Sequence, residues 1–269
     1  AGSYSGAVDG ELWYNSTATT FQYKFGATAG AWSTSNNLNT ARTYLAGAGT
    51  QTAALGFGGR TDGTPPFVGV TEAYNGSSWT EVNDLNTIRA GLAGAGTQTA
   101  ALGFGGYFTP PTSEKVDTET WNGTNWTEVN NLNTARRALG GVGANNTAAL
   151  AFGGSPPAGI ANTELWNGTN WTEVNDLNTQ RRSMGGAGTQ PAALAFGGSN
   201  PPFTTLAITE LWNGTNWTEV NDLNVGHKAW AGAGTQTAAL GFGGYGASAL
   251  TESWNGTNWT VANNLNTGR

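Results

Sequence analysis

The feature that most constrains the fold of this chain is a tandem repeat of 44 to 48 residues. The dipeptide Gly-Gly follows an apolar run five times, from Gly58-Gly59 to Gly243-Gly244, at steps of 47, 48, 44 and 46 residues. A second signature, Trp followed six residues later by Leu-Asn, occurs six times: at Trp32, Trp79, Trp126, Trp171, Trp217 and Trp259. Five units carry both signatures, and the N-terminal stretch carries only the second. Such a period indicates stacked, equivalent structural units.

One unit, residues 136–178, shows what the repeat builds. Short runs of strand length alternate with turn residues, and no helical periodicity is present. The turn at 167–170 contains Asn-Gly between two Trp-bearing runs, which is a strong hairpin signal. We expect four antiparallel strands, at 137–143, 147–152, 163–166 and 171–174. A four-stranded unit of this length repeated in tandem is typical of a propeller blade.

The sequence therefore predicts an all-β fold, a β-propeller of four-stranded antiparallel blades. The Ala-Gly-Ala-Gly runs at 46–49 and 93–96 suit innermost strands, which crowd together near the axis. Five complete blades are predicted within residues 42–269, with residues 1–41 as an attached N-terminal β-hairpin segment. The alternative is six blades, of which the N-terminal one is incomplete.

The order of features in each unit supports a family resemblance. An apolar run, Gly-Gly, a variable loop, Glu before an aromatic residue and then a Trp resemble the kelch repeat over residues 42–266. The period lies between those of WD40 and kelch blades. The sequence departs from kelch in having Trp rather than Tyr as the usual aromatic residue, and in its short, Ala/Gly-rich blades.

Two further resemblances concern viruses of bacteria. Residues 10–17 with 21–25 and Trp32 look like a short β-hairpin element of bacteriophage tail-fibre and other virion proteins. The repeated Asn-Gly-Thr-Asn-Trp-Thr-Glu-Val-Asn-Asp-Leu-Asn-Thr resembles repeat arrays in virion proteins of marine phages, including cyanophages. These resemblances imply a virion structural or adhesion protein on a phage tail or capsid surface. They also imply host surface glycans or neighbouring virion proteins as partners, and are compatible with a homo-oligomer formed through the fibre.

Composition argues against several other classes. Charged residues make up 10% of the chain, there is one histidine and there is no cysteine. The lack of cysteine excludes disulfides and thiolate chemistry. The net charge of −6 argues against nucleic acid as the main partner. We expect no membrane insertion, signal peptide or transmembrane segment, because no apolar run approaches about 20 residues. We also expect no cofactor and no enzymatic activity. A purely structural repeat module without a ligand is the alternative function; a glycan-active enzyme is a further alternative, against which the lack of a carboxylate constellation argues.

One basic residue recurs per unit just after Leu-Asn-Thr or Leu-Asn-Val. These residues are Arg42, Arg89, Arg136, Arg181 and His227. A propeller would arrange them in a ring, where they could bind an anion or an acidic sugar. The alternative, which repetition in every unit favours, is inter-blade hydrogen bonding to backbone carbonyls and to Asp84, Asp176 or Asp222. His227 is not expected to be a catalytic base, since no nucleophile or acid accompanies it.

Two other recurring residue types have simpler explanations. The glutamates of Thr-Glu and Trp-Thr-Glu-Val are expected to be solvated charges at the outer edge: Glu119, Glu128, Glu164 and Glu173. The repeated Asn-Gly-Thr and Asn-Trp-Thr triplets match the glycosylation pattern, but turn chemistry already explains their asparagines.

The loops between the second and third strands of each unit break the repeat. They cover 60–70, 107–117, 155–162, 199–208 and 245–250, and they differ in length and content. Up-and-down strands would place these loops on the same face as the arginine ring. Prolines stiffen them, and exposed aromatic rings could stack on sugars. We therefore predict a ligand-binding face formed by Phe67, Tyr107, Phe108, Phe203 and Tyr245, with Arg89 and Arg136 as polar partners. Variation that is merely tolerated in loops is the alternative.

Overall fold

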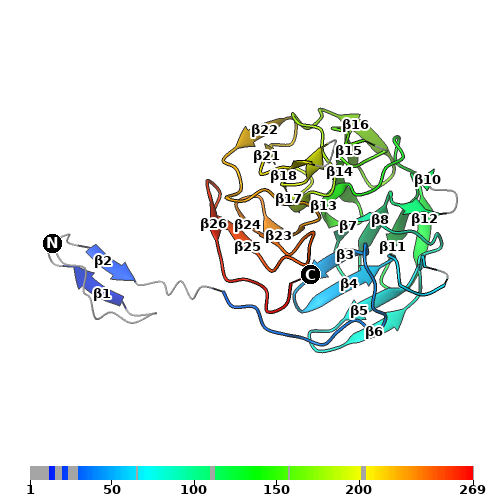
Figure 1. Cartoon of the computed structure of the whole chain (residues 1–269), viewed down its shortest axis with the longest axis horizontal. Coiled ribbons are helices and arrows are strands. Elements are labelled where there is room, and N and C mark those ends of the chain that lie inside the picture. Colours follow the sequence, from blue (N-terminus) through cyan, green and yellow to red (C-terminus); the bar gives the residue numbers. More distant parts are fainter. Residues whose placement is uncertain are drawn as a thin grey trace.

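The structure is a computed structural model, and it describes residues 12–15, 20–23, 30–64, 66–109, 113–156, 158–200 and 204–268. Five four-stranded antiparallel sheets stand around a common axis as the blades of a β-propeller (Figure 1). This confirms the predicted all-β fold with five complete blades. In the described ranges the regular elements are all strands, and no helix that could cross a membrane occurs there.

Each blade runs outward from the axis in sequence order. Blade 1 consists of β3 (Ala46–Thr50), β4 (Ala53–Phe57), β5 (Thr71–Tyr74) and β6 (Trp79–Val82). Blade 2 consists of β7 (Ala93–Gly96), β8 (Ala101–Phe104), β11 (Thr118–Trp121) and β12 (Trp126–Val129). Blade 3 consists of β13 (Gly140–Asn145), β14 (Ala148–Phe152), β15 (Thr163–Trp166) and β16 (Trp171–Val174). Blade 4 consists of β17 (Gly185–Thr189), β18 (Ala192–Phe196), β21 (Thr209–Trp212) and β22 (Trp217–Val220). Blade 5 consists of β23 (Ala231–Thr235), β24 (Ala238–Phe242), β25 (Thr251–Trp254) and β26 (Trp259–Val261).

Three small hairpins lie outside the blades. The N-terminal pair β1 (Leu12–Asn15) and β2 (Thr20–Tyr23) is antiparallel. The pairs β9 (Tyr107–Phe108) with β10 (Ser113–Glu114) and β19 (Ser199–Asn200) with β20 (Thr204–Thr205) give structure to two of the variable loops. These two variable loops are therefore partly ordered by their own backbone hydrogen bonds.

The first strand of blade 3 is shorter at its start than the sequence suggested, whereas those of blades 1 and 2 begin at the predicted residues 46 and 93. In blade 3 the strand begins at Gly140 rather than at residue 137. The reason is Ala138, whose φ of 51° lies in the left-handed region and interrupts an extended strand. Tyr44, Ser183 and Ala229 at the matching positions also have positive φ.

Small residues on the inner strands let neighbouring blades approach closely. A Cβ atom at Gly94 would lie 2.8 Å from Cζ of Phe57 in the preceding blade. Phe57, Phe104, Phe152 and Phe196 are in consequence fully buried between blades. The packing confirms the steric reason inferred for the Ala/Gly-rich runs.

The repeated tryptophans of the fourth strands fill the wider, outer part of each interface. Trp126, Trp171, Trp217 and Trp259 are buried to the same degree, whereas Trp79 of blade 1 is half-buried. The indole N–H of Trp126 donates to the Thr71 hydroxyl of the preceding blade at 3.0 Å. The same bond joins Trp171 to Thr118, Trp217 to Thr163 and Trp259 to Thr209. Each Trp thus ties its blade to the one before.

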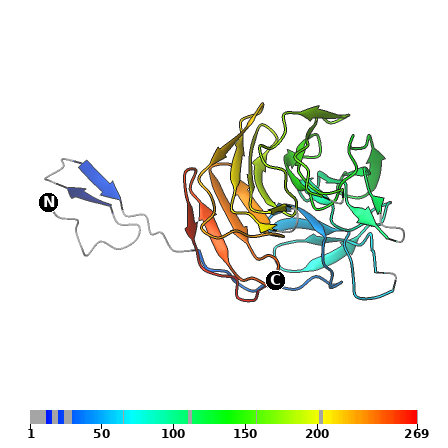
Figure 2. The ribbon, with the colours of Figure 1, turned by 45° about the horizontal axis from the view of Figure 1, so that its top comes forward.

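The segment from residue 30 to residue 41 runs along the outer edge from blade 5 to blade 1 (Figures 1 and 2). The Trp32 indole donates to the Thr251 hydroxyl at 3.2 Å, and its ring lies 4.9 Å from that of Phe242. Asn39 donates to the Trp79 carbonyl at 2.9 Å. These residues, which the sequence assigned to the N-terminal segment, therefore contact both end blades.

Candidate functional site

The variable loops and the connections between blades share one face, as predicted. The residue after each Gly-Gly forms an antiparallel β-bridge with the residue after each ring arginine. Arg60 pairs in this way with Thr43, and Tyr107 with Ala90. Arg137 with Ser155, Arg182 with Ser199 and Lys228 with Tyr245 repeat the arrangement. We call this the loop face, defined by these five pairs and the loops that follow them.

The predicted aromatic residues differ widely in exposure. Tyr245 is 74% exposed, whereas Phe67 is only 3% exposed, so the expectation that Phe67 is a surface ring is wrong. Phe67 is covered because its ring packs against those of Tyr107 and Phe108, both 5.3 Å away and both half-buried. Phe203 lies outside the described residues.

The ring arginines lie beneath the surface. Arg89 is fully buried and donates to Oε1 of Glu119 at 2.5 Å and to the Gly103 carbonyl at 3.2 Å. Arg136 is fully buried and donates to Glu164 at 2.9 Å. Burial lowers the pKa of Arg136, and the charges of Glu164, Asp176 and Glu173 oppose that shift. Neither side chain has surface to offer a ligand, so neither enters the binding surface proposed below.

The carboxylates that hold these arginines correct two expectations. Glu119 and Glu164 are buried, not solvated at the outer edge, whereas Glu128 and Glu173 are exposed. The aspartates named as alternative partners bond elsewhere, since Asp84 and Asp176 accept from the backbone N–H of Thr71 and Thr163. The buried glutamate is the functional residue that the sequence interpretation missed. In every repeat this glutamate stands two residues before an inward-facing aromatic residue, and that fixed position was the sequence signal for its burial.

Each buried glutamate clamps the linker that enters its blade. Glu119 accepts from the backbone N–H of Asn86 at 2.8 Å, from its side-chain amide at 2.9 Å and from Arg89. Glu72, Glu164 and Glu210 accept the matching backbone N–H bonds from Asn39, Asn133 and Asn178. The ring of basic residues is therefore a structural device that fixes each blade to the next.

His227 takes the arginine position in blade 5 and lies against Trp230. The two rings are stacked, with centroids 4.4 Å apart, and Nε2 of His227 is buried without a hydrogen-bond partner among the described residues. Burial lowers the pKa of His227, against the opposing effect of Glu252. Of the described residues, no group of three or more His, Asp or Glu side chains could hold a metal ion.

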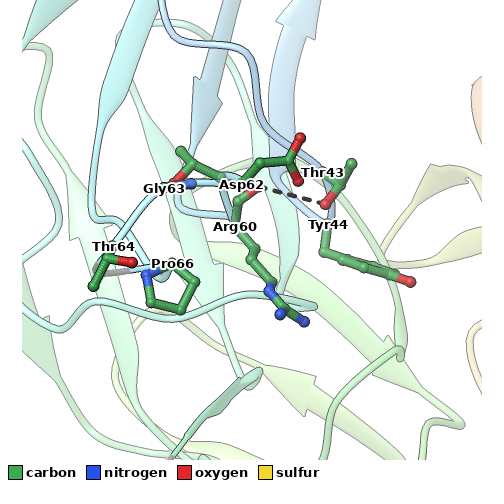
Figure 3. Close-up of a pocket in the computed structure, with 8 residues that line it drawn as sticks. Thr43, Tyr44, Arg60, Asp62, Gly63, Thr64 and Pro66 are labelled. Atoms are coloured by element: carbon green, nitrogen blue, oxygen red, sulfur yellow. Dashed lines mark hydrogen bonds between the residues drawn. The ribbon is translucent and has the colours of Figure 1, made fainter.

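The loop face carries a shallow hollow at blade 1. It has a volume of about 460 Å³ and is lined by Thr43, Tyr44, Arg60, Thr61, Asp62, Gly63, Thr64 and Pro66. The side chains of Arg60 and Tyr44 extend from neighbouring segments along the same side of the backbone (Figure 3). Tyr44 is exposed, and the other residues that line the hollow include the carboxylate of Asp62 and the guanidinium of Arg60. The hollow therefore combines one aromatic surface with several hydrogen-bonding groups.

Positive charge gathers on the same face. Of the lysines and arginines in the described ranges, those that are not ring arginines are Arg60, Lys115, Arg137, Arg182 and Lys228, all in the loops or connections of the loop face. Two of them lie over tyrosine rings: Arg137 is 4.7 Å from the Tyr107 centroid, and Lys228 is 4.3 Å from that of Tyr245. Arg137 also lies 3.7 Å from Glu114. These basic side chains stand beside the carboxylates of Asp62, Glu114 and Asp117 in the same loops, so the loop face carries charges of both signs.

The opposite rim carries the repeated Asn-Gly-Thr-Asn turns. In each turn the first asparagine accepts two backbone N–H bonds, as Asn122 does from Thr124 and Asn125, and the glycine has positive φ. These asparagines are explained by turn geometry, as the sequence interpretation held.

The comparisons with known proteins bear on the fold. No protein-family model matches this sequence, and no curated protein matches it. A solved structure titled "Structure of YjhT" superposes with a TM-score of 0.71 over 87% of each chain, at 11% sequence identity. At that identity the likeness shows a shared β-propeller fold and nothing of activity.

Proposed function

We propose that this protein is a non-enzymatic binding module that recognises acidic carbohydrate through the loop face. The single observation that carries the proposal is the placement of Arg60, Lys115, Arg137, Arg182 and Lys228 on that face. Cationic groups attract carboxylated or sulfated sugars, and the exposed rings of Tyr44 and Tyr245 offer flat surfaces for sugar rings. The loops that bear these groups differ between blades, while the strands below them are nearly copied.

The resemblance to virion proteins gives this binding a biological setting. We propose a kelch-like phage adhesion protein on a tail fibre or capsid surface, whose loop face contacts host surface glycans. A neighbouring virion protein is the second candidate ligand, supported by the partly buried aromatic cluster of Phe67, Tyr107 and Phe108.

The test compares variants of equal charge change on opposite rims. Arg60→Gln, Arg182→Gln and Lys228→Gln together remove three positive charges from the loop face. Thr124→Glu, Thr169→Glu and Thr215→Glu together add three negative charges to the exposed turns of the opposite rim. On an array of acidic and neutral glycans, binding should be confined to acidic glycans, should weaken with salt and should be lost only in the loop-face variant. Equal loss in both variants, or binding to neutral glycans only, would contradict the proposal.

A further inference from the structure

A second hollow lies between blades 1 and 2 and has a volume of about 260 Å³. Residues of the Asn-Gly turns of both blades line it, which places it on the rim opposite the loop face. Blade 1 contributes Leu55, Ala73 and Val82, and blade 2 contributes the ring of Trp121. Leu55 and Trp121 are buried, whereas Ala73 and Val82 are half-buried. The hollow therefore reaches from the apolar interface between two blades toward solvent.

Ala73 is the residue whose small size makes room for this hollow. Leu165 of blade 3 and Leu211 of blade 4 stand at the place of Ala73, each paired across the sheet with a leucine of the second strand, as Ala73 is. Both pack into the apolar clusters between their blade and the next. In blade 2 the place is taken by Thr120, whose hydroxyl accepts from the side-chain amide of Asn146 at 2.9 Å. Ala73 carries only a methyl group, so the hollow takes the space that an isobutyl group fills in two other interfaces.

Hydrogen bonds across the interface hold the walls of the hollow apart. The Trp121 indole N–H donates to the Gln98 carbonyl at 3.0 Å. The side-chain amide of Gln98 donates in turn to the Ala54 carbonyl of blade 1 at 3.1 Å. Because the ring and the turn beside it are both fixed, the neighbouring side chains are restricted in how far they can relax into the space.

The mouth of the hollow is polar and uncharged. Thr80 of β6 and Thr99 of the turn between β7 and β8 are exposed, and both line it. Of the described residues that line the hollow, none is charged. A ligand that fits it therefore needs an apolar group for the base and neutral hydrogen-bonding groups for the mouth.

We propose that this hollow is a second binding site, which takes an uncharged ligand through a branched aliphatic group of the size of a leucine side chain. Leu165 and Leu211 show that such a group fits the equivalent place. Burial of the aliphatic group against Leu55, Val82 and Trp121 supplies the affinity, and the Thr80 hydroxyl orients the polar part of the ligand. The site is separate from the loop face and does not depend on glycan binding there.

The site is tested with N-acetyl-leucinamide, which joins a leucine side chain to neutral amides. In an NMR titration it should shift the signals of the Trp121 indole and the Ala73 methyl group saturably. Its affinity should exceed that of N-acetylglycinamide, the matched control, by at least about tenfold, the preference expected from burying an isobutyl group.

Two variants locate the binding. Ala73→Leu fills the hollow with a side chain of the protein, as in blades 3 and 4, and should abolish the shifts without lowering the thermal midpoint. Thr80→Val keeps the apolar base and should weaken binding about fivefold, the effect of one lost hydrogen bond.

Four results would overturn the proposal: no saturable binding, equal affinity for the two probes, binding that persists in Ala73→Leu, or a lowered thermal midpoint or misfolding of that variant. Unchanged binding in Thr80→Val would overturn the role of its hydroxyl. The glycan measurements on the loop-face variants are independent of these results, because Arg60, Arg182 and Lys228 do not line this hollow.

Discussion

Glu119 and Glu128 are directly paired across strands β11 and β12, yet Glu119 is fully buried and Glu128 is exposed. The difference arises from the linker that enters the blade. Residues Asn86 to Arg89 lie over Glu119 and surround its carboxylate with four N–H donors, whereas Glu128 stands on the outermost strand and accepts only from the Thr87 hydroxyl at 3.3 Å. Two identical residues in one hairpin therefore differ in what they contribute to stability.

We expect Glu119→Gln to destabilise the protein by about 3–5 kcal/mol, because it leaves the buried Arg89 without its counter-charge. Glu128→Gln, the matched control, should change the free energy of unfolding by less than about 0.5 kcal/mol. Urea denaturation of the two variants measures both values. Equal effects would show that the buried ion pair does not hold the linker.

The indole of Trp171 gives a second prediction. Trp171→Ala should cost about 3–5 kcal/mol, as for other buried aromatic residues. Trp171→Phe keeps most of the apolar contact but leaves the buried Thr118 hydroxyl without its donor, and should cost about 1–3 kcal/mol. Trp79→Ala should cost less than Trp171→Ala, because Trp79 is half-buried. Guanidinium titration of the three variants orders them, and a different order would contradict this account of the interfaces.

The repeat was sufficient to predict the blades, because strand length, the Asn-Gly turns and the Gly-Gly dipeptides that end each second strand are local properties of the sequence. The burial of Glu119 was not predictable in that way. Its partners Asn86 and Arg89 come from the preceding linker, and only the closing of one blade against the next brings them together. A charged residue in an alternating strand pattern is normally solvated, so the local rule gave the wrong environment.

The loop face was predictable in position but not in detail. Up-and-down strands fix which connections share a rim, and the structure confirms that arrangement. Whether the Phe67 ring is exposed depends on its contacts with Tyr107 and Phe108 of the next variable loop. The sequence of the Phe67 loop alone does not show those contacts. The basic residues Arg137 and Arg182 were overlooked because each directly follows a ring arginine, from which it differs in being only half-buried.

A third prediction separates buried from exposed aromatic residues on the loop face. Phe67→Ser should lower the thermal midpoint by several degrees, because it opens the cluster with Tyr107 and Phe108. Tyr245→Ser should leave the midpoint unchanged, since that ring is 74% exposed, and should weaken glycan binding by about 1 kcal/mol or more if it contacts the ligand. Differential scanning calorimetry and glycan titration measure the two effects. A stable Phe67→Ser variant would show that the cluster does not support the loops.

The last prediction concerns pH and His227. This is the single histidine of the sequence, and burial against Trp230 lowers its pKa below the ordinary value of about 6.5. In the unfolded chain the imidazole binds a proton near pH 6.5, while in the folded protein it stays neutral to a lower pH. The unfolded state therefore holds more protons in that window, so stability should be complete above about pH 6.5 and should fall as the pH drops toward the lowered pKa. His227→Gln removes the titrating group and should flatten the thermal midpoint between about pH 5 and 7, which Tm measurements at constant ionic strength would record. A midpoint that falls equally in the variant would show that His227 does not cause the pH dependence.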